Sequence, residues 1–212
     1  MALVTPYTLK ASLRKSMLRT LKSMSEADIE AQSIQVAQIL FKEKFFREAK
    51  SIGCYLSMGK GELRTNHIVS DILQRGIRLF TPYIPEGENS EMRMLRLHST
   101  ADLEACPLDK WGILDPSPTR RDANGEARED AMDWGIQPLD LILIPGVAFD
   151  RDCNRIGASV YLYRSELTPF AVALALSPQI LRADSVPTTE LDFRLDGIVS
   201  PEGIIWREGV QE

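Results

Sequence analysis

Hydrophobic residues follow a helical spacing in some segments of the chain and form short continuous runs in others. The helical spacing predicts helices over residues 8–22, 26–41 and 66–75. Ser25 is expected to cap the second helix, with Asp28 three residues later, and Gly76 to end the third.

Strand-length apolar runs alternate with these helices. They occupy residues 51–56, 77–81, 141–144, 171–176 and 196–200. Residues 92–97 alternate between apolar and basic, as in a half-exposed strand, and Pro82 is expected to stop the strand before them. The run at 141–144 is the most apolar of the chain, so we expect it to be a central buried strand.

The alternation of strands with helices indicates the α/β class with a largely parallel sheet. The stretch from 98 to 138 is rich in turn residues, and its charged end is expected to be solvated. The apolar residues within 160–167 follow neither a helical nor a strand spacing. No internal repeat or interdomain linker is evident, so we expect one domain over residues 1–212.

The first 25 residues contain several lysines and arginines and no acid before Glu26. This composition, with Ser12, Ser16 and Ser23, fits a mitochondrial transit peptide. It also fits a basic helix in which Leu13, Met17 and Leu21 form one apolar stripe. Such a helix can lie on a domain and direct its cations at an anionic ligand, and the sequence leaves both interpretations open.

Composition and missing motifs exclude several classes of protein. The net charge of −5 argues against nucleic-acid or anionic-membrane binding by the whole surface, and no apolar run reaches the ~20 residues that span a bilayer. The three cysteines are far apart, which disfavours a disulfide framework and a structural zinc site and favours a reducing compartment. The chain contains no GxxxxGK[ST], GxGxxG, HExxH or GxSxG motif.

Six fragments, taken in order, carry a resemblance. They are KASLRK at 10–15, CYLSMGKGEL at 54–63, KWGILDP at 110–116, DLILIPGVAFD at 140–150, NRIG at 154–157 and VPTTELDFRLDGIVSPEGI at 186–204. Together they cover most of the chain and resemble the 5-formyltetrahydrofolate cyclo-ligase family, also called methenyltetrahydrofolate synthetase.

The resemblance implies a single three-layer α/β/α domain, a cytoplasmic monomer, and a small-molecule substrate with no nucleic-acid or membrane partner. A mitochondrial location stays open because of the basic N-terminus. In that family the formyl oxygen of 5-formyltetrahydrofolate attacks the γ-phosphate of ATP in the presence of Mg²⁺. N10 then attacks the imidate phosphate and phosphate leaves, giving 5,10-methenyltetrahydrofolate.

The resemblance also implies roles for particular residues, although it singles out no catalytic one. The residues expected to bind ATP are Lys10, Ala11, Ser12, Leu13, Arg14, Arg155, Ile156 and Gly157. Those expected to bind the folate are Arg14, Leu56, Met58, Glu62 and Trp111. Asp192 matches a metal-binding aspartate.

From the residues alone, each of these positions also has a plainer interpretation. Lys10 and Arg14 are four apart and would share a solvated basic helical face. Glu62 would be an exposed loop acid, and Trp111 a core tryptophan.

The sequence departs from the family after Gly157. A glycine-rich basic segment of the form RGKGYYD is expected there, but Ala158, Ser159 and Val160 follow instead. Because such a segment supplies phosphate donors and a Mg²⁺ carboxylate, its loss predicts turnover far slower than that of a typical member. The alternative function is therefore a catalytically impaired folate- or nucleotide-binding protein.

Overall fold

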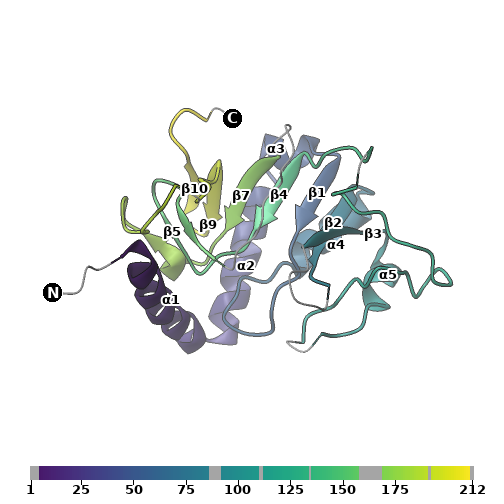
Figure 1. Cartoon of the computed structure of the whole chain (residues 1–212), viewed down its shortest axis with the longest axis horizontal. Coiled ribbons are helices and arrows are strands. Elements are labelled where there is room, and N and C mark those ends of the chain that lie inside the picture. The colour runs from purple at the N-terminus through teal and green to yellow at the C-terminus, as the bar shows by residue number, and fades with distance from the viewer. Residues whose placement is uncertain are drawn as a thin grey trace.

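A seven-stranded sheet forms the centre of the computed structural model, which describes residues 5–85, 92–109, 112–133, 135–157, 169–190 and 192–210 (Figure 1). Its strands lie in the order β10-β9-β7-β4-β1-β2-β3. Their bounds in chain order are β1 Ser51–Cys54, β2 Arg78–Tyr83, β3 Arg93–Leu97, β4 Leu141–Ile144, β7 Phe170–Leu174, β9 Gly197–Ser200 and β10 Gly203–Trp206. The five inner strands run parallel, and β3 and β10 are antiparallel edge strands. The predicted α/β class with a mostly parallel sheet is confirmed.

Helices α2 (Glu26–Leu40) and α4 (Asn66–Gln74) pack on one face of this sheet, which lies in front of them in Figure 1. Their apolar sides join the strand residues in the largest core cluster, in which Val36, Leu40 and Ile72 are fully buried. The expected caps are present. The Ser25 Oγ accepts a hydrogen bond from the Asp28 amide at 3.0 Å, and Gly76 has a φ of 69° directly after α4.

A small second sheet stands beside the first and has the order β6-β5-β8. Its strands are β5 Ala148–Asp150, β6 Arg155–Ile156 and β8 Ile180–Leu181, the last preceded by the 3-10 turn η1 (Ser177–Gln179). Phe149 and Cys153 of this unit, together with Leu195, pack on the second face of the main sheet over Ile142 and Ala173. The small sheet, which follows β4 in the chain, is therefore packed against the main sheet.

Helix α1 (Pro6–Ser23) lies at the side of the molecule next to the small sheet (Figure 1). Met17 packs against Ile156 and Val186 in a small cluster that Leu13 also contacts, and Leu21 belongs to the main core. The predicted apolar stripe is thus confirmed. None of the described helices is long and apolar enough to cross a membrane.

The segment between β3 and β4 contains little regular structure apart from α5 (Thr100–Glu104). A buried ion pair holds it, because the guanidinium of Arg128 donates two hydrogen bonds of 2.6 Å to the carboxylate of Asp102. These side chains are 2% and 0% exposed. A buried pair with this geometry fixes the path of a segment that has few ladder hydrogen bonds.

One local expectation differs from the structure, and several short elements were not predicted. Pro82 lies inside β2, opposite Met94 of β3, rather than at its end. Because β1 pairs with β2 only as far as Phe80, the missing N–H of Pro82 can face the unpaired edge. The pattern also missed the short helices α3 (Lys44–Glu48) and α5, the edge strand β10, and the three short strands of the small sheet.

All three cysteines are free and buried. Burial raises the pKa of the Cys106 thiol to about 11 and that of Cys153 to about 11, so both stay protonated at neutral pH.

Candidate functional site

The carboxyl ends of β1 and β4 lie next to each other at the point where the chain reverses direction across the sheet. From β1 the chain continues to β2 on one side, whereas from β4 it reaches β7 on the other. In open α/β sheets this switch point is where ligands bind. The segments that leave it are residues 55–65 after β1 and 145–147 after β4, and we call the region between them the carboxyl-end crevice.

Glu62 lies in the loop after β1 and is half-buried. Its Oε2 accepts a hydrogen bond of 2.7 Å from the backbone N–H of Met58. Burial raises the pKa of the Glu62 carboxyl, although the Met58 N–H and the charge of Arg64 work in the opposite direction. Met58 itself is 40% exposed, and Leu56 is half-buried. The loop thus presents a partly desolvated carboxylate beside apolar side chains.

Arg64 holds this loop in shape. Its guanidinium donates to the carbonyl of Met58 at 2.5 Å and to that of Gly59 at 2.7 Å, and it forms an ion pair with Glu26 at the start of α2. The loop that carries Glu62 is therefore attached to the beginning of α2. Sequence reasoning missed Arg64, and no local motif identifies it.

Two segments that are far apart in sequence meet along α1. Nζ of Lys10 donates to the carboxylate of Asp192 at 2.6 Å, and Arg14 donates to the carbonyl of Gly157 at 2.7 Å. Arg155 donates to the carbonyl of Pro145, directly after β4, at 3.1 Å. The cations predicted to bind phosphate are therefore brought to one edge of the crevice.

The charges at this edge influence one another. The pKa of Arg155 lies below its usual value because of burial and because of the nearby charge of Arg14, while Asp192 opposes this shift. Burial alone would raise the pKa of Asp192. The hydrogen bonds from Lys10 and Thr189 outweigh burial and hold that pKa below the usual value. Two guanidinium groups thus share an environment in which an anion would be stabilised.

Glycines allow the close approach of backbone at this edge. A Cβ on Gly157 would lie 2.3 Å from a terminal nitrogen of Arg155, and one on Gly146 would lie 2.4 Å from the ring of Phe149. Any side chain at position 157 would therefore displace the guanidinium of Arg155.

The other residues expected to bind ATP differ in exposure. Ala11 and Ser12 are exposed on α1, whereas the side chains of Leu13 and Ile156 pack together with Met17. The carbonyl of Ile156 accepts a hydrogen bond of 2.6 Å from the N–H of Val147. The side chains of Leu13 and Ile156 therefore stabilise the fold by packing.

Asp192 is the carboxylate that the resemblance predicts to bind the metal ion. Among the described residues, no group of three His, Cys, Asp or Glu side chains is arranged to hold a metal ion. The Asp192 oxygens accept from Lys10 and from the N–H and hydroxyl of Thr189, at 2.6 and 2.8 Å for the latter two. Mg²⁺ usually binds one or two carboxylates together with substrate phosphates, so Asp192 fits a site that the nucleotide completes. The Thr-x-x-Asp spacing could have revealed the contribution of Thr189.

Two expected parts of the site lie outside the described residues. They are Trp111 and the segment 158–168 that follows Gly157.

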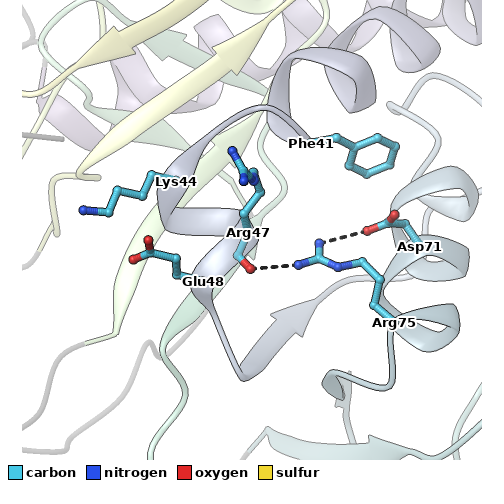
Figure 2. A pocket seen from close by; sticks show the side chains of 6 residues that line it. All are labelled: Phe41, Lys44, Arg47, Glu48, Asp71 and Arg75. Atoms are coloured by element: carbon cyan, nitrogen blue, oxygen red, sulfur yellow. Dashed lines mark hydrogen bonds and ion pairs between the residues drawn. The ribbon is translucent and has the colours of Figure 1, made fainter.

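A hollow of about 730 Å³ lies at the opposite, amino end of the parallel strands, near the ends of α2, α3 and α4. Figure 2 shows the guanidinium of Arg75 between the carboxylate of Asp71 and the backbone carbonyl of Arg47, while Lys44 points away from them. The hollow is lined by Phe41, Lys44, Arg47, Glu48, Asp71 and Arg75. None of the residues expected to bind ATP, folate or metal is among them.

Comparison with known proteins relates this arrangement to one family. Residues 7–201 match the family model described as "5-formyltetrahydrofolate cyclo-ligase family". A mouse protein named 5-formyltetrahydrofolate cyclo-ligase is 31% identical over 94% of this chain and 97% of its own length. A protein of Arabidopsis thaliana, named 5-formyltetrahydrofolate cyclo-ligase, mitochondrial, is 32% identical over 92% of this chain and 75% of its own length.

Solved structures show the same fold. The 5,10-methenyltetrahydrofolate synthetase of Aquifex aeolicus superposes with a TM-score of 0.74 at 24% identity, over 96% of this chain and 95% of that one. The corresponding protein of Mycoplasma pneumoniae gives a TM-score of 0.61 at 18% identity, over 91% and 98%. The extent of the family match, together with the two relatives above 30% identity, shows that the chain belongs to the 5-formyltetrahydrofolate cyclo-ligase family.

Proposed function

We propose that this chain is an enzyme that converts 5-formyltetrahydrofolate to 5,10-methenyltetrahydrofolate with ATP, and that the carboxyl-end crevice is its active site. The observation that carries the proposal is the meeting of Arg14, Arg155 and Lys10 at one edge of a crevice whose loop after β1 presents Glu62. Membership of the family supports the reaction, and nothing in the comparisons favours the catalytically impaired alternative.

In this proposal the polyphosphate of ATP binds along residues 10–14 and 155–157. Phosphoryl transfer requires mainly the positioning of the phosphates and the neutralisation of their charge. Burial and then the charge of Arg14 lower the pKa of Arg155, and the charge of a bound phosphate would act in the opposite direction. Two fixed guanidinium groups also match phosphate oxygens in geometry.

The folate would bind between the loop after β1 and Arg14. Leu56 and Met58 offer apolar surface to the ring system, and the carboxylate of Glu62 accepts hydrogen bonds from its N–H donors. Trp111 is retained in the proposal as a stacking residue, since it falls in the matching fragment at 110–116.

Asp192 is the residue proposed to hold Mg²⁺. When bound, the ion would neutralise phosphate charge and orient the phosphates. The present partner of Asp192 is Lys10, itself proposed to contact phosphate, so nucleotide binding exchanges an internal ion pair for contacts with the ligand.

The chemistry requires three things of the residues of the chain. They must hold the formyl oxygen near the γ-phosphate, stabilise the charge on the transferred phosphoryl group, and exclude water from the imidate phosphate until N10 attacks. The first two fall to the two edges of the crevice, which are the loop after β1 and the cations of α1 and β6.

We further propose that residues 1–212 form one domain that acts as a monomer in the cytoplasm on a small-molecule substrate, without nucleic-acid or membrane partners. The Arabidopsis relative is named as mitochondrial, and the basic character of α1 leaves that location as the alternative. Size-exclusion chromatography with light scattering tests the monomer, and fractionation of cells tests the location.

The deciding experiment incubates the purified chain with 5-formyltetrahydrofolate, ATP and Mg²⁺ and follows methenyltetrahydrofolate by its ultraviolet absorbance. We expect product formation that stops when ATP is omitted. Absence of product would overturn the proposal. A second variant with an RGKGYYD-type segment inserted after Gly157 would then distinguish the impaired alternative, for which insertion restores turnover.

A further inference from the structure

Asp150 is a fully buried aspartate at the end of β5, directly before the turn that leads into β6. Its Oδ1 accepts hydrogen bonds from the backbone N–H groups of Asp152 and Asn154, at 3.1 and 3.0 Å. Its Oδ2 accepts from the side-chain amide of Asn154 and from the backbone N–H of Val186, both at 3.1 Å. Four N–H donors thus compensate the burial of this carboxylate.

The two oxygens of Asp150 bind different parts of the chain. The bonds to Oδ1 come from the backbone of the turn between β5 and β6, and the oxygen of an asparagine would accept them equally well. Val186 lies outside this hairpin, after β8, and its N–H uses the second oxygen. An asparagine would place a donor there, opposite another donor. The connection to Val186 therefore requires a carboxylate.

Three more hydrogen bonds join the hairpin to the segment that follows β8. They are the Asp184 N–H to Asp152 Oδ2 at 2.7 Å, the Arg194 Nε to Asn154 Oδ1 at 3.2 Å, and the Leu195 N–H to the Cys153 carbonyl at 3.0 Å. The connected positions 184, 186, 194 and 195 lie on both sides of Asp192 in the sequence. Asp192 consequently belongs to a segment that is attached to the hairpin before and after it.

The two connected segments carry different parts of the proposed ATP site. The hairpin carries Arg155, which is the first residue of β6 and donates to the carbonyl of Pro145. The segment after β8 carries Asp192, the proposed Mg²⁺ carboxylate. The two side chains are close enough for the charge of Asp192 to act on the pKa of Arg155. The bonds around Asp150 therefore set how far apart the phosphate cation and the metal carboxylate lie.

We propose that Asp150 is a positioning residue of the active site, which fixes Arg155 and Asp192 at the spacing that one magnesium-bound nucleotide requires. This inference rests on the proposed function and adds a residue to its nucleotide site. In the absence of Mg²⁺, the phosphates can settle on the cations wherever these lie. In its presence they must meet Arg155 and the ion on Asp192 at once, so an error in spacing weakens binding. Misplacement by about 1 Å can cost an active site about a hundredfold.

The measurement that isolates this role is the magnesium gain, which is the dissociation constant for ATP with excess EDTA divided by that with Mg²⁺. Titration calorimetry without folate gives both constants. Mg²⁺ should strengthen ATP binding to the parent. Asp150→Asn should lower the magnesium gain about fivefold toward one, since it opposes a donor to the N–H of Val186. The affinity for 5-formyltetrahydrofolate should not change.

Asp140→Asn is the matched control. Asp140 directly precedes β4, at the amino end of the parallel strands, and its Oδ2 accepts from the backbone N–H groups of Lys50 and Ser51 at 2.7 and 2.9 Å. It too connects two segments through a carboxylate, but far along the sheet from the crevice. Asp140→Asn should lower the melting temperature and keep the parental magnesium gain. If Asp150→Asn behaves in the same way, Asp150 has a structural role only and the proposal is wrong.

A second variant tests the same connection if Asp150→Asn does not fold. Asp152 is half-buried, and Asp152→Ala removes the bond to the N–H of Asp184 while all four bonds to the Asp150 carboxylate can remain. Its melting temperature should lie near that of the parent. The magnesium gain should fall in the same direction as for Asp150→Asn but by a smaller factor. A parental gain in Asp152→Ala would then overturn the proposal.

The outcomes separate the role of Asp150 from the proposed function. If the parent shows a magnesium gain and the folded Asp150→Asn protein retains it, the assignment of Asp150 is wrong and the proposed function stands. If the parent binds ATP equally well with and without Mg²⁺, the roles of Asp192 and Asp150 are both overturned. If the parent binds no ATP at all, the proposed function is overturned with them.

Discussion

Basic side chains gather at both ends of the parallel strands, but they make different contacts at each end. In the hollow at the amino end, Arg75 pairs with Asp71 at 3.2 Å, donates to the carbonyl of Arg47 at 2.8 Å and lies 5.4 Å above the ring of Phe46. A cation near the ends of helices satisfies backbone carbonyls and interacts well with the helix dipole. Its contacts stabilise the fold.

In the carboxyl-end crevice the balance of charge is different. Lys10, Arg14 and Arg155 meet there, and the carboxylate that interacts with them is Asp192. Arg14 donates to the carbonyl of Gly157 and Arg155 to that of Pro145, at the same end of the small sheet, and the charge of Arg14 is close enough to affect Arg155. The comparison teaches that the number of cations does not identify a ligand site. Like charges that the fold holds close together, as it holds Arg14 and Arg155, do.

The largest expected effect is that of Arg14→Ala. Loss of a preorganised donor at the transferring phosphoryl group typically slows turnover about a hundredfold or more. Methenyltetrahydrofolate formation at saturating ATP measures it. Arg47→Ala in the amino-end hollow is the matched control and should retain the parental rate. Similar losses in both variants would remove the proposed difference between the two ends.

The next effect is that of Glu62→Gln on folate binding. Exchange of one acceptor oxygen for a donor should cost about 1.5–3 kcal/mol of binding free energy, as for a charge-assisted hydrogen bond. Titration with 5-formyltetrahydrofolate measures this loss, and ATP affinity should not change. Unchanged folate affinity would leave Glu62 as a loop acid only.

The same variant should also change the pH dependence of stability. Burial raises the pKa of Glu62 in the folded state, so the charged form is disfavoured there. The parent therefore loses stability as the pH rises through that pKa, and Glu62→Gln does not. The melting temperature of the free variant should exceed that of the parent at neutral pH, and the two should converge at acidic pH.

A smaller effect is expected from Lys10→Ala. ATP affinity should fall several-fold, less than in Arg14→Ala, because Lys10 must leave Asp192 before it can contact phosphate. The loss should be greater at low salt, since contacts between partly exposed charges are screened. ATP affinity equal to that of the parent at all salt concentrations would exclude the role of Lys10.

The smallest effect is that of Arg75→Ala. Removal of a partly exposed pair and one carbonyl contact should reduce the free energy of unfolding by about 1 kcal/mol or less. Chemical denaturation measures it, and turnover should be that of the parent. A loss of ATP affinity in this variant would contradict the assignment of the amino end to stability alone.

The elements that were predictable from the sequence are those with long periodic patterns. Helices α1, α2 and α4 and the buried strand β4 follow directly from their apolar spacing. Short α3, α5 and β10 were missed, because tertiary contacts rather than local periodicity stabilise them. Trp206 of β10, for example, lies against Phe45 of α3 with ring centroids 5.5 Å apart. Pro82 was misjudged because its effect depends on which strand edge is paired.

The site was predictable only in part. The resemblance indicated Lys10, Arg14, Arg155, Glu62 and Asp192, yet it gave no contact between them. Lys10 and Asp192 are 182 residues apart, and no periodicity predicts such a pair. Arg64 likewise gains its role from neighbours that folding brings close.

The attachment of α1 has a consequence for how the protein responds to solution conditions. The buried residues of α1 are Met17 and Leu21, in its second half, whereas its first half is fastened through Lys10 to Asp192 and Arg14 to Gly157. Apolar contacts weaken on cooling, but partly exposed ion pairs weaken as salt is added. Ionic strength, more than temperature, should therefore govern how often the beginning of α1 detaches. Amide hydrogen exchange in residues 9–14 should become faster with added salt while exchange in residues 17–23 hardly changes.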